Sequence, residues 1–194
     1  MAQTSTTLIA TKAHITSITG TDISLSATSG VYTIQATSTV LTGAGKLAVG
    51  DLITVSGSAS NNSTFTVSTV VSTLEITVAE VVTSENADGS STITLDHVGF
   101  VSTKAKGDGY YSQPDGVHTV AYQVNSTMTG SIKMQGSLAT TPTEDDWFDI
   151  AGSTFTADQS TLISTANFTG NFVWVRAKAT SVTAGTISSV LINS

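Results

Sequence analysis

The chain contains no cysteine among its 194 residues. This excludes disulfide bridges and metal centres with thiolate ligands. Cations are also scarce, because 7 lysines and arginines stand against 14 aspartates and glutamates and give a net charge of −7. Proteins bind nucleic acids largely by neutralising phosphates with lysine and arginine, so we expect no nucleic-acid partner.

Long apolar runs are missing as well. No stretch approaches the roughly 20 apolar residues that a membrane-spanning helix requires, so we expect no membrane partner. The first residues, Met1–Thr7, have neither the basic start nor the apolar centre of a secretory signal. We therefore expect the chain to be made and folded in the cytoplasm of the cell that produces it.

Apolar and polar residues alternate along most of the chain, as in Leu74–Val78, and the polar partners are mostly threonine and serine. A period of two is that of a pleated strand, whereas a helix needs a period near 3.6. In the first half, this pattern predicts strands at Asp22–Leu25, Tyr32–Ala36, Leu52–Val55, Thr64–Val71, Leu74–Val78 and Thr92–Asp96. The expected core of this half is Phe65, Val67, Leu74, Ile76, Val78, Ile93 and Leu95.

The second half has the same character, with strands predicted at Val120–Val124, Ile132–Gln135, Trp147–Ile150, Phe172–Arg176 and Thr186–Ile192. Four successive apolar residues, Phe172–Val175, predict a central strand buried on both faces, with Trp174 in the core. Only Thr156–Ala166 favours a short helical turn.

Turn-forming residues divide these strands. Asn61 and Asn62 mark the tip of one hairpin, and Asp88-Gly89 predicts a second hairpin between Val78–Val82 and Thr92–Leu95. Charge and glycine concentrate in residues 103–111, and a turn follows at Gln113–Gly116. We expect an all-β protein of two consecutive antiparallel domains: residues 1–101 as a small sandwich or barrel, 102–117 as a linker or crossover, and 118–194 as a β-sandwich or jelly roll.

Few residues suggest chemistry. Asp145, Asp146 and Asp149 form the densest acidic cluster and are weak candidates for a calcium site, but no EF-hand spacing accompanies them, and a solvated acidic loop is the first interpretation. The three histidines stand in no catalytic or metal-binding motif. We expect no enzyme, no catalytic residue and no cofactor.

Aromatic residues are only 6% of the chain, so most are needed in the cores. Tyr110 and Tyr111 lie in the predicted linker, and they are the candidate residues for contact with a ligand or partner.

Two stretches resemble known proteins. Leu47–Val78, with Gly50-Asp51-Leu52-Ile53-Thr54-Val55-Ser56-Gly57 and Asn61-Asn62-Ser63-Thr64-Phe65-Thr66-Val67, resembles a small β module of tailed-bacteriophage virion proteins. Residues 118–194 are similar to β-sandwich domains of structural proteins from cyanophages and related marine phages, through Ser131–Leu138, Trp147–Ile150, Gly170–Arg176 and Ala184–Ile187. The same pattern looks like discoidin-type jelly rolls, which bind sugars or lipids through variable loops, so it carries over no binding residue.

The resemblance implies a non-enzymatic virion structural protein, such as a capsid decoration protein, a head fibre or a tail accessory protein. Its partners would be other capsid or tail proteins and further copies of itself, with a trimer as one form of the oligomer. It would reside in the virion after synthesis in the host cytoplasm. The alternative is an adhesion module of a head or tail fibre that binds carbohydrates on the host surface.

Overall fold

The computed structural model of the chain describes residues 5–111 and 116–193. These residues are all-β, as predicted, and contain no α-helix; two short 3-10 helices, η1 (Asp108–Tyr111) and η2 (Glu144–Asp146), interrupt the strands. Hydrogen bonds join the strands into antiparallel sheets of 5 and 12 strands, neither closed into a barrel within the described ranges. No helical segment in this part of the chain has the length and apolar character that a membrane crossing requires.

The chain divides into two compact units. The smaller unit comprises residues 15–99, and the larger unit comprises residues 1–14 together with 100–194. The prediction grouped residues 1–101, but β1 (Thr6–Ile9) and β2 (Lys12–Ala13) pair with β17 (Thr186–Asn193) and so fold with the second half. Residues 1–14 and 15–99 are adjacent in sequence but belong to different units, because strands far apart along the chain can pair with each other.

The smaller unit contains the six strands that alternation predicted in the first half. They are β4 (Ile23–Thr28), β5 (Val31–Ala36), β6 (Asp51–Ser56), β7 (Thr64–Ser72), β8 (Glu75–Val78) and the start of β9 (Ile93–Val101). A further strand, β3 (Ile18–Gly20), was not predicted. Their order is β9-β6-β7-β8-β5-β4, with β3 paired to β9. The predicted hairpin at Asn61-Asn62 is confirmed, since β6 and β7 are antiparallel neighbours.

Two expectations for this unit need correction. Six of the seven predicted core residues are buried, but Leu74 is only half-buried, because β8 begins one residue later and leaves Leu74 in the turn. Asp88-Gly89 forms a turn but no hairpin, since β8 pairs with β5 and β7, whereas β9 pairs with β3 and β16. The local signal identified the turn and could not identify the partners of its strands.

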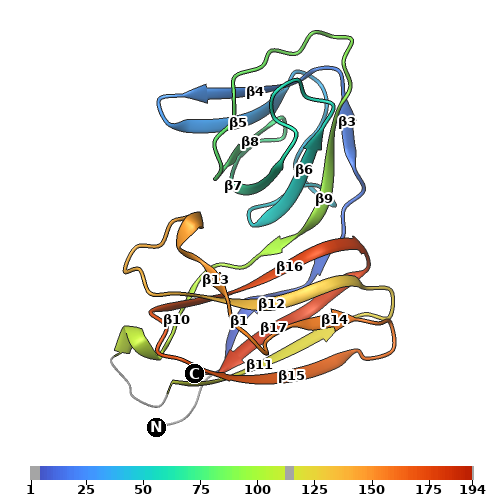
Figure 1. The fold of residues 1–194 in the computed structure, drawn as a ribbon. Coiled ribbons are helices and arrows are strands. Elements are labelled where there is room, and N and C mark those ends of the chain that lie inside the picture. Colours follow the sequence, from blue (N-terminus) through green and yellow to red (C-terminus); the bar gives the residue numbers. More distant parts are fainter. Residues whose placement is uncertain (1–4, 112–115, 194) are drawn as a thin grey trace. The chain divides into compact units, whose positions relative to one another are not determined.

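The larger unit has two layers (Figure 1). One layer contains β1, β17, β11 (Val117–Val124) and β15 (Ile163–Thr169) in that order, with β2 also on β17. The other is built on β12 (Thr129–Ser137) and β16 (Trp174–Ala184), with the short strands β10 (Ala105–Lys106), β13 (Phe148–Asp149) and β14 (Phe155–Ala157) at its margins.

Both layers contribute to one buried cluster. Val120, Tyr122 and Val190 come from the first layer, and Ile132, Val175 and Ala177 come from the second. At every second position these strands point an apolar side chain inward, which is the arrangement that period-two patterning produces. The outward positions of β12 and β16 are consequently left for polar, charged and aromatic side chains.

Two expectations for this unit also need correction. Thr156–Ala166 forms no helical turn, because β14 and β15 take its two ends and a turn at Asp158–Thr161 joins them. Trp174 is half-buried on the outer face of β16 and is not a core residue. β16 is central, as predicted, with β12 on one side and β10 and β9 on the other. Most of the predicted turn at Gln113–Gly116 lies outside the described residues.

Candidate functional site

Most of the cations lie on the outer face of the layer that contains β16. Five of the seven, all within residues 104–178, belong to β10, β12, β16 or the residues beside them. We call this surface the cation–aromatic face; it comprises Lys104, Lys106, Tyr110, Tyr111, Lys133, Gln135, Trp147, Trp174, Arg176 and Lys178.

Strand geometry creates this face. Val175, Ala177 and Ala179 point into the core and are fully buried. Trp174, Arg176 and Lys178 alternate with them and therefore point outward. The register places Ser137, Gln135 and Lys133 of β12 opposite Trp174, Arg176 and Lys178, respectively, and Lys106 of β10 opposite Trp174 on the other side.

The two predicted contact tyrosines lie at one end of the face. Tyr110 and Tyr111, in η1, are 44% and 58% exposed. The Tyr110 ring lies 5.2 Å from the Trp174 ring and 5.3 Å from the Tyr111 ring, centroid to centroid. Lys106 Nζ lies 4.1 Å from the Tyr110 centroid, and Lys104 Nζ lies 4.4 Å from that of Trp174. Three aromatic rings and two ammonium groups thus share one patch, a combination that can bind flat or anionic groups.

Arg176 organises the other end. Its guanidinium donates two hydrogen bonds of 2.9 Å to the Glu144 carboxylate, and its Nε donates to Gln135 Oε1 at 2.9 Å. The Trp147 ring covers it, with Cζ 4.2 Å from the ring centroid. The bidentate geometry fits a planar guanidinium and would not be met by a lysine. These contacts hold the segment that contains η2 against the sheet.

The three candidate metal ligands do different work here. Thr143 donates its amide and its hydroxyl to Asp146, at 2.7 and 2.8 Å, and these hydrogen bonds hold the pKa of Asp146 below its ordinary value. Asp149 accepts from Lys133 and Gln135. Asp145 is exposed. Within the described residues no three histidine, aspartate or glutamate side chains are grouped so that they could hold a metal ion.

Two opposing effects act on Asp149. Partial burial disfavours its charged form, but the hydrogen bonds from Lys133 and Gln135 and the positive charges of Lys133 and Lys178 outweigh this, so the pKa of Asp149 is lowered. The carboxylate therefore stays ionised and balances part of the positive charge of the face.

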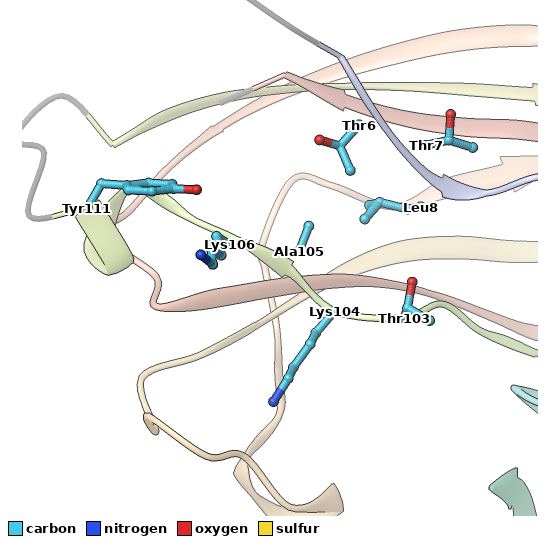
Figure 2. A pocket seen from close by; sticks show the side chains of 8 residues that line it. All are labelled: Thr6, Thr7, Leu8, Thr103, Lys104, Ala105, Lys106 and Tyr111. Carbon is cyan, nitrogen blue, oxygen red and sulfur yellow. The ribbon is translucent and has the colours of Figure 1, made fainter. Parts of the chain in front are cut away.

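A pocket of about 340 Å³ opens next to the tyrosine end. Figure 2 shows its lining on two strand segments, Thr6, Thr7 and Leu8 from β1 and Thr103–Lys106 from β10 and the residue pair before it, with Tyr111 at one end. Lys104 extends away from the opening in this view, in accord with its position over Trp174. Among the described residues, the lining provides hydroxyls and ammonium groups but no carboxylate, histidine or thiol that could act as a base or nucleophile.

The sequence contained a signal for this face. Trp174, Arg176 and Lys178 form a period-two pattern of large polar or amphipathic side chains, and the intervening residues are the small apolar Val175 and Ala177. The apolar run Phe172–Val175 concealed it, because Phe172 and Val173 precede the strand and do not belong to its alternation.

A scan of the chain against models of protein families finds no match, and a search of the curated proteins finds none either. Arguments about function therefore depend on the residues and their geometry.

Proposed function

We propose that this chain is a non-enzymatic structural protein of a bacteriophage virion that decorates or cements the capsid by docking flat β surfaces onto other virion proteins. The observation that carries the proposal is a row of hydroxyl side chains across the smaller unit. Ser26, Thr33, Thr77 and Thr69 lie opposite one another on β4, β5, β8 and β7. We call them the hydroxyl row.

The hydroxyl row is suited to docking. The side chains of Thr69 and Thr77 share a hydrogen bond of 2.6 Å, and Thr77 has a second, also of 2.6 Å, with Ser68. Neighbouring outward positions carry Ser24, Thr28 and Gln35, and Glu75 lies opposite Gln35, so the face has few charges. A flat surface with few charges and many hydrogen-bonding groups can pack on a repeated protein shell at a low desolvation cost.

The carboxylates support a structural role. Asp22 accepts hydrogen bonds from the amides of residues 37–39, Asp88 from those of 90 and 91, and Asp158 from those of 160 and 161. These bonds lower the pKa of each group, to about 2 for Asp158. Acids ionised and fixed in turns stabilise loops and are poorly suited to proton transfer near neutral pH.

The finer architecture belongs to the same proposal. We infer that the two layers of the larger unit form a β-sandwich of the jelly-roll kind and that the two units act as separate domains, one docking on the particle while the other projects. The single buried cluster shared by the two layers supports this inference.

The proposal is tested by sedimentation with particles. Purified protein should co-sediment with empty capsids, or with tails, of the phage that encodes it. Thr33→Lys with Thr77→Lys should weaken this binding at least tenfold by placing charge in the hydroxyl row, whereas Ala87→Lys, in the exposed loop after β8, should not. Absence of the protein from both capsid and tail pellets would rule the proposal out.

A second function, binding of acidic or neutral glycans, is favoured by the tyrosine end of the cation–aromatic face. Aromatic rings stack on sugar rings, and the ammonium groups of Lys104 and Lys106 would pair with a sugar carboxylate or sulfate. A glycan array tests this: Tyr111→Ala should abolish any signal, and Val117→Ala, at a similarly exposed position, should retain it. An array without signal for the unmodified protein would eliminate this function.

A further inference from the structure

β15 is an outermost strand of the five-stranded sheet, and within the described residues it pairs only with β11 (Figure 1). Its seven residues follow β11 in unbroken antiparallel register, from Val117 opposite Thr169 to Gln123 opposite Ile163. The far side of such a strand presents unpaired N–H and C=O groups, which form a template for another strand.

Other outer strands are protected against such pairing. The free side of β4 is bridged at Leu25, which exchanges two backbone hydrogen bonds with Glu85. β1 has four residues and a bulge, and β10 and β13 have two residues each, with Lys106 in one and Asp149 in the other. Short length, bulges and charge are the usual means by which proteins close sheet edges.

β15 has none of these protections. Its sequence, Ile163-Ser164-Thr165-Ala166-Asn167-Phe168-Thr169, contains no charge and no proline. At its start Ile163 is 64% exposed, and the preceding Leu162 is 42% exposed. A strand of this length, without a bulge or a charge, is expected to be covered in the assembled protein.

The strand is complementary to itself. If two copies align antiparallel about Ala166, Thr165 of each lies opposite Asn167 of the other on the outer face, and Ile163 lies opposite Thr169. Ala166 meets its own copy at the axis, where a small side chain is needed because identical side chains face each other there. Ala166 packs on the buried cluster, so pairing would continue the apolar layer from one copy into the next.

Charge also favours a second copy. The chain carries a net charge of −7, so contact between copies is opposed at most surfaces by repulsion. A neutral seven-residue strand is a place where two such chains can meet at small electrostatic cost.

We propose that two copies of the chain pair antiparallel through β15 about a twofold axis at Ala166, so that the five-stranded sheets of both copies become one. This pairing does not depend on the capsid binding proposed above, and a dimer could form whether or not that binding occurs.

The test uses two matched double variants of the full chain and sedimentation velocity. Thr165→Lys with Asn167→Lys places two lysines opposite each other at two points of the strand pair. This repulsion should raise the dimer dissociation constant at least tenfold. Thr165→Lys with Asn167→Glu changes the same two positions but places opposite charges face to face, so it should remain dimeric. Gln123→Lys, on the outer face of central β11, should also remain dimeric.

Several results would overturn the proposal. These are a monomeric unmodified protein at hundred-micromolar concentration, a trimer, or a Lys/Lys variant as dimeric as the Lys/Glu variant. Hydrogen exchange provides a second readout that needs no variant. The β15 amides should exchange at least tenfold faster on dilution below the dissociation constant, and rates independent of concentration would contradict pairing at this edge.

Discussion

The guanidinium of Arg176 lies over the indole ring of Trp147, 4.2 Å from Cζ to the ring centroid, while it donates two hydrogen bonds to Glu144. Arg176 is on β16, whereas Trp147 and Glu144 belong to the segment between β12 and β13. One side chain thus fastens a loop to the sheet. Because the Arg176 side chain is only 5% exposed, its contacts are screened less than those of a surface ion pair.

Arg176→Lys should therefore lower the free energy of unfolding by about 1–2 kcal/mol, since a lysine cannot make the paired hydrogen bonds to Glu144 or the bond to Gln135. Equilibrium urea unfolding followed by tryptophan fluorescence measures this. Lys178→Arg is the control, two residues along the same outward face, and it should change the stability by less than about 0.5 kcal/mol. Equal effects of the two substitutions would contradict the role of Arg176.

Local pattern was sufficient for much of the fold. Alternation located β5, β6 and β7 and six core residues, because each strand buries one face and the period of two is then imposed by solvent. It failed where the buried side chains are small or the partner strand is distant. β15 has serine, threonine and asparagine at most positions, and its first residues lie in the stretch that was predicted as a short helical turn. Its strand character comes from pairing with β11, some 40 residues earlier.

The candidate site was predictable in part for the same reason. Tyr110 and Tyr111 were identifiable as exposed because they sit among charged and glycine residues. The contact of Tyr110 with Trp174 joins residues more than 60 positions apart and depends on β10 pairing with β16. No local pattern contains that register, so the sequence indicated the tyrosines but not the patch they complete.

Gly57 and Gly89 provide a matched pair for a backbone prediction. Both have left-handed φ, +79° and +73°, so alanine carries the same conformational strain of about 1 kcal/mol at each. At Gly89 an added Cβ would meet nothing within 4 Å, whereas at Gly57 it would lie 2.1 Å from the Thr92 carbonyl oxygen. We expect Gly89→Ala to cost about 1 kcal/mol of stability and Gly57→Ala at least about 3 kcal/mol.

Thermal and urea unfolding of both glycine variants measures the difference, which isolates the clash with Thr92 from the strain they share. Similar losses at the two positions would mean that the approach of Thr92 to Gly57 is not as close as the structure has it.

Asp22 makes the stability of the smaller unit depend on acid. Hydrogen bonds from the hydroxyl and amide of Thr39 and from Ser38 hold its pKa well below the ordinary 3.8. A lowered pKa in the folded state means that the unfolded chain takes up the proton first. The stabilising contribution is therefore complete above pH 3.8 and is lost as the pH falls below it.

Asp22→Asn should reduce stability at neutral pH and flatten its decline between pH 3.8 and more acidic solution. Urea unfolding across this range, with a carboxyl NMR titration, measures both effects. Asp145→Asn is the control, because the described part of the chain offers Asp145 no hydrogen-bond donor, and it should leave the acid profile unchanged. If Asp22→Asn also follows the unmodified profile, Asp22 contributes nothing to acid sensitivity.

Tyr122 should make the larger unit sensitive to alkali. It is 1% exposed, stacks on Phe155 with 5.7 Å between ring centroids, and donates its hydroxyl hydrogen to the Ser153 carbonyl. Burial raises the pKa of Tyr122 above the ordinary 10.0. The unfolded chain then loses this proton at a lower pH than the folded one, so the contribution is complete below pH 10.0 and declines above it.

Tyr122→Phe retains the ring stack and removes the hydroxyl. It should cost about 1–2 kcal/mol below pH 10.0, because the Ser153 carbonyl is left without this donor in a buried site, and the alkaline decline in stability should become shallower. Unfolding at a series of pH values, with tyrosinate absorbance to follow ionisation, measures both changes. Tyr111→Phe, at an exposed ring, should leave the stability and its alkaline profile as they are. If Tyr122→Phe does not alter the decline of stability at alkaline pH, the phenol ionises as readily in the folded protein as in the unfolded chain. That outcome would contradict the burial of Tyr122 between the two layers.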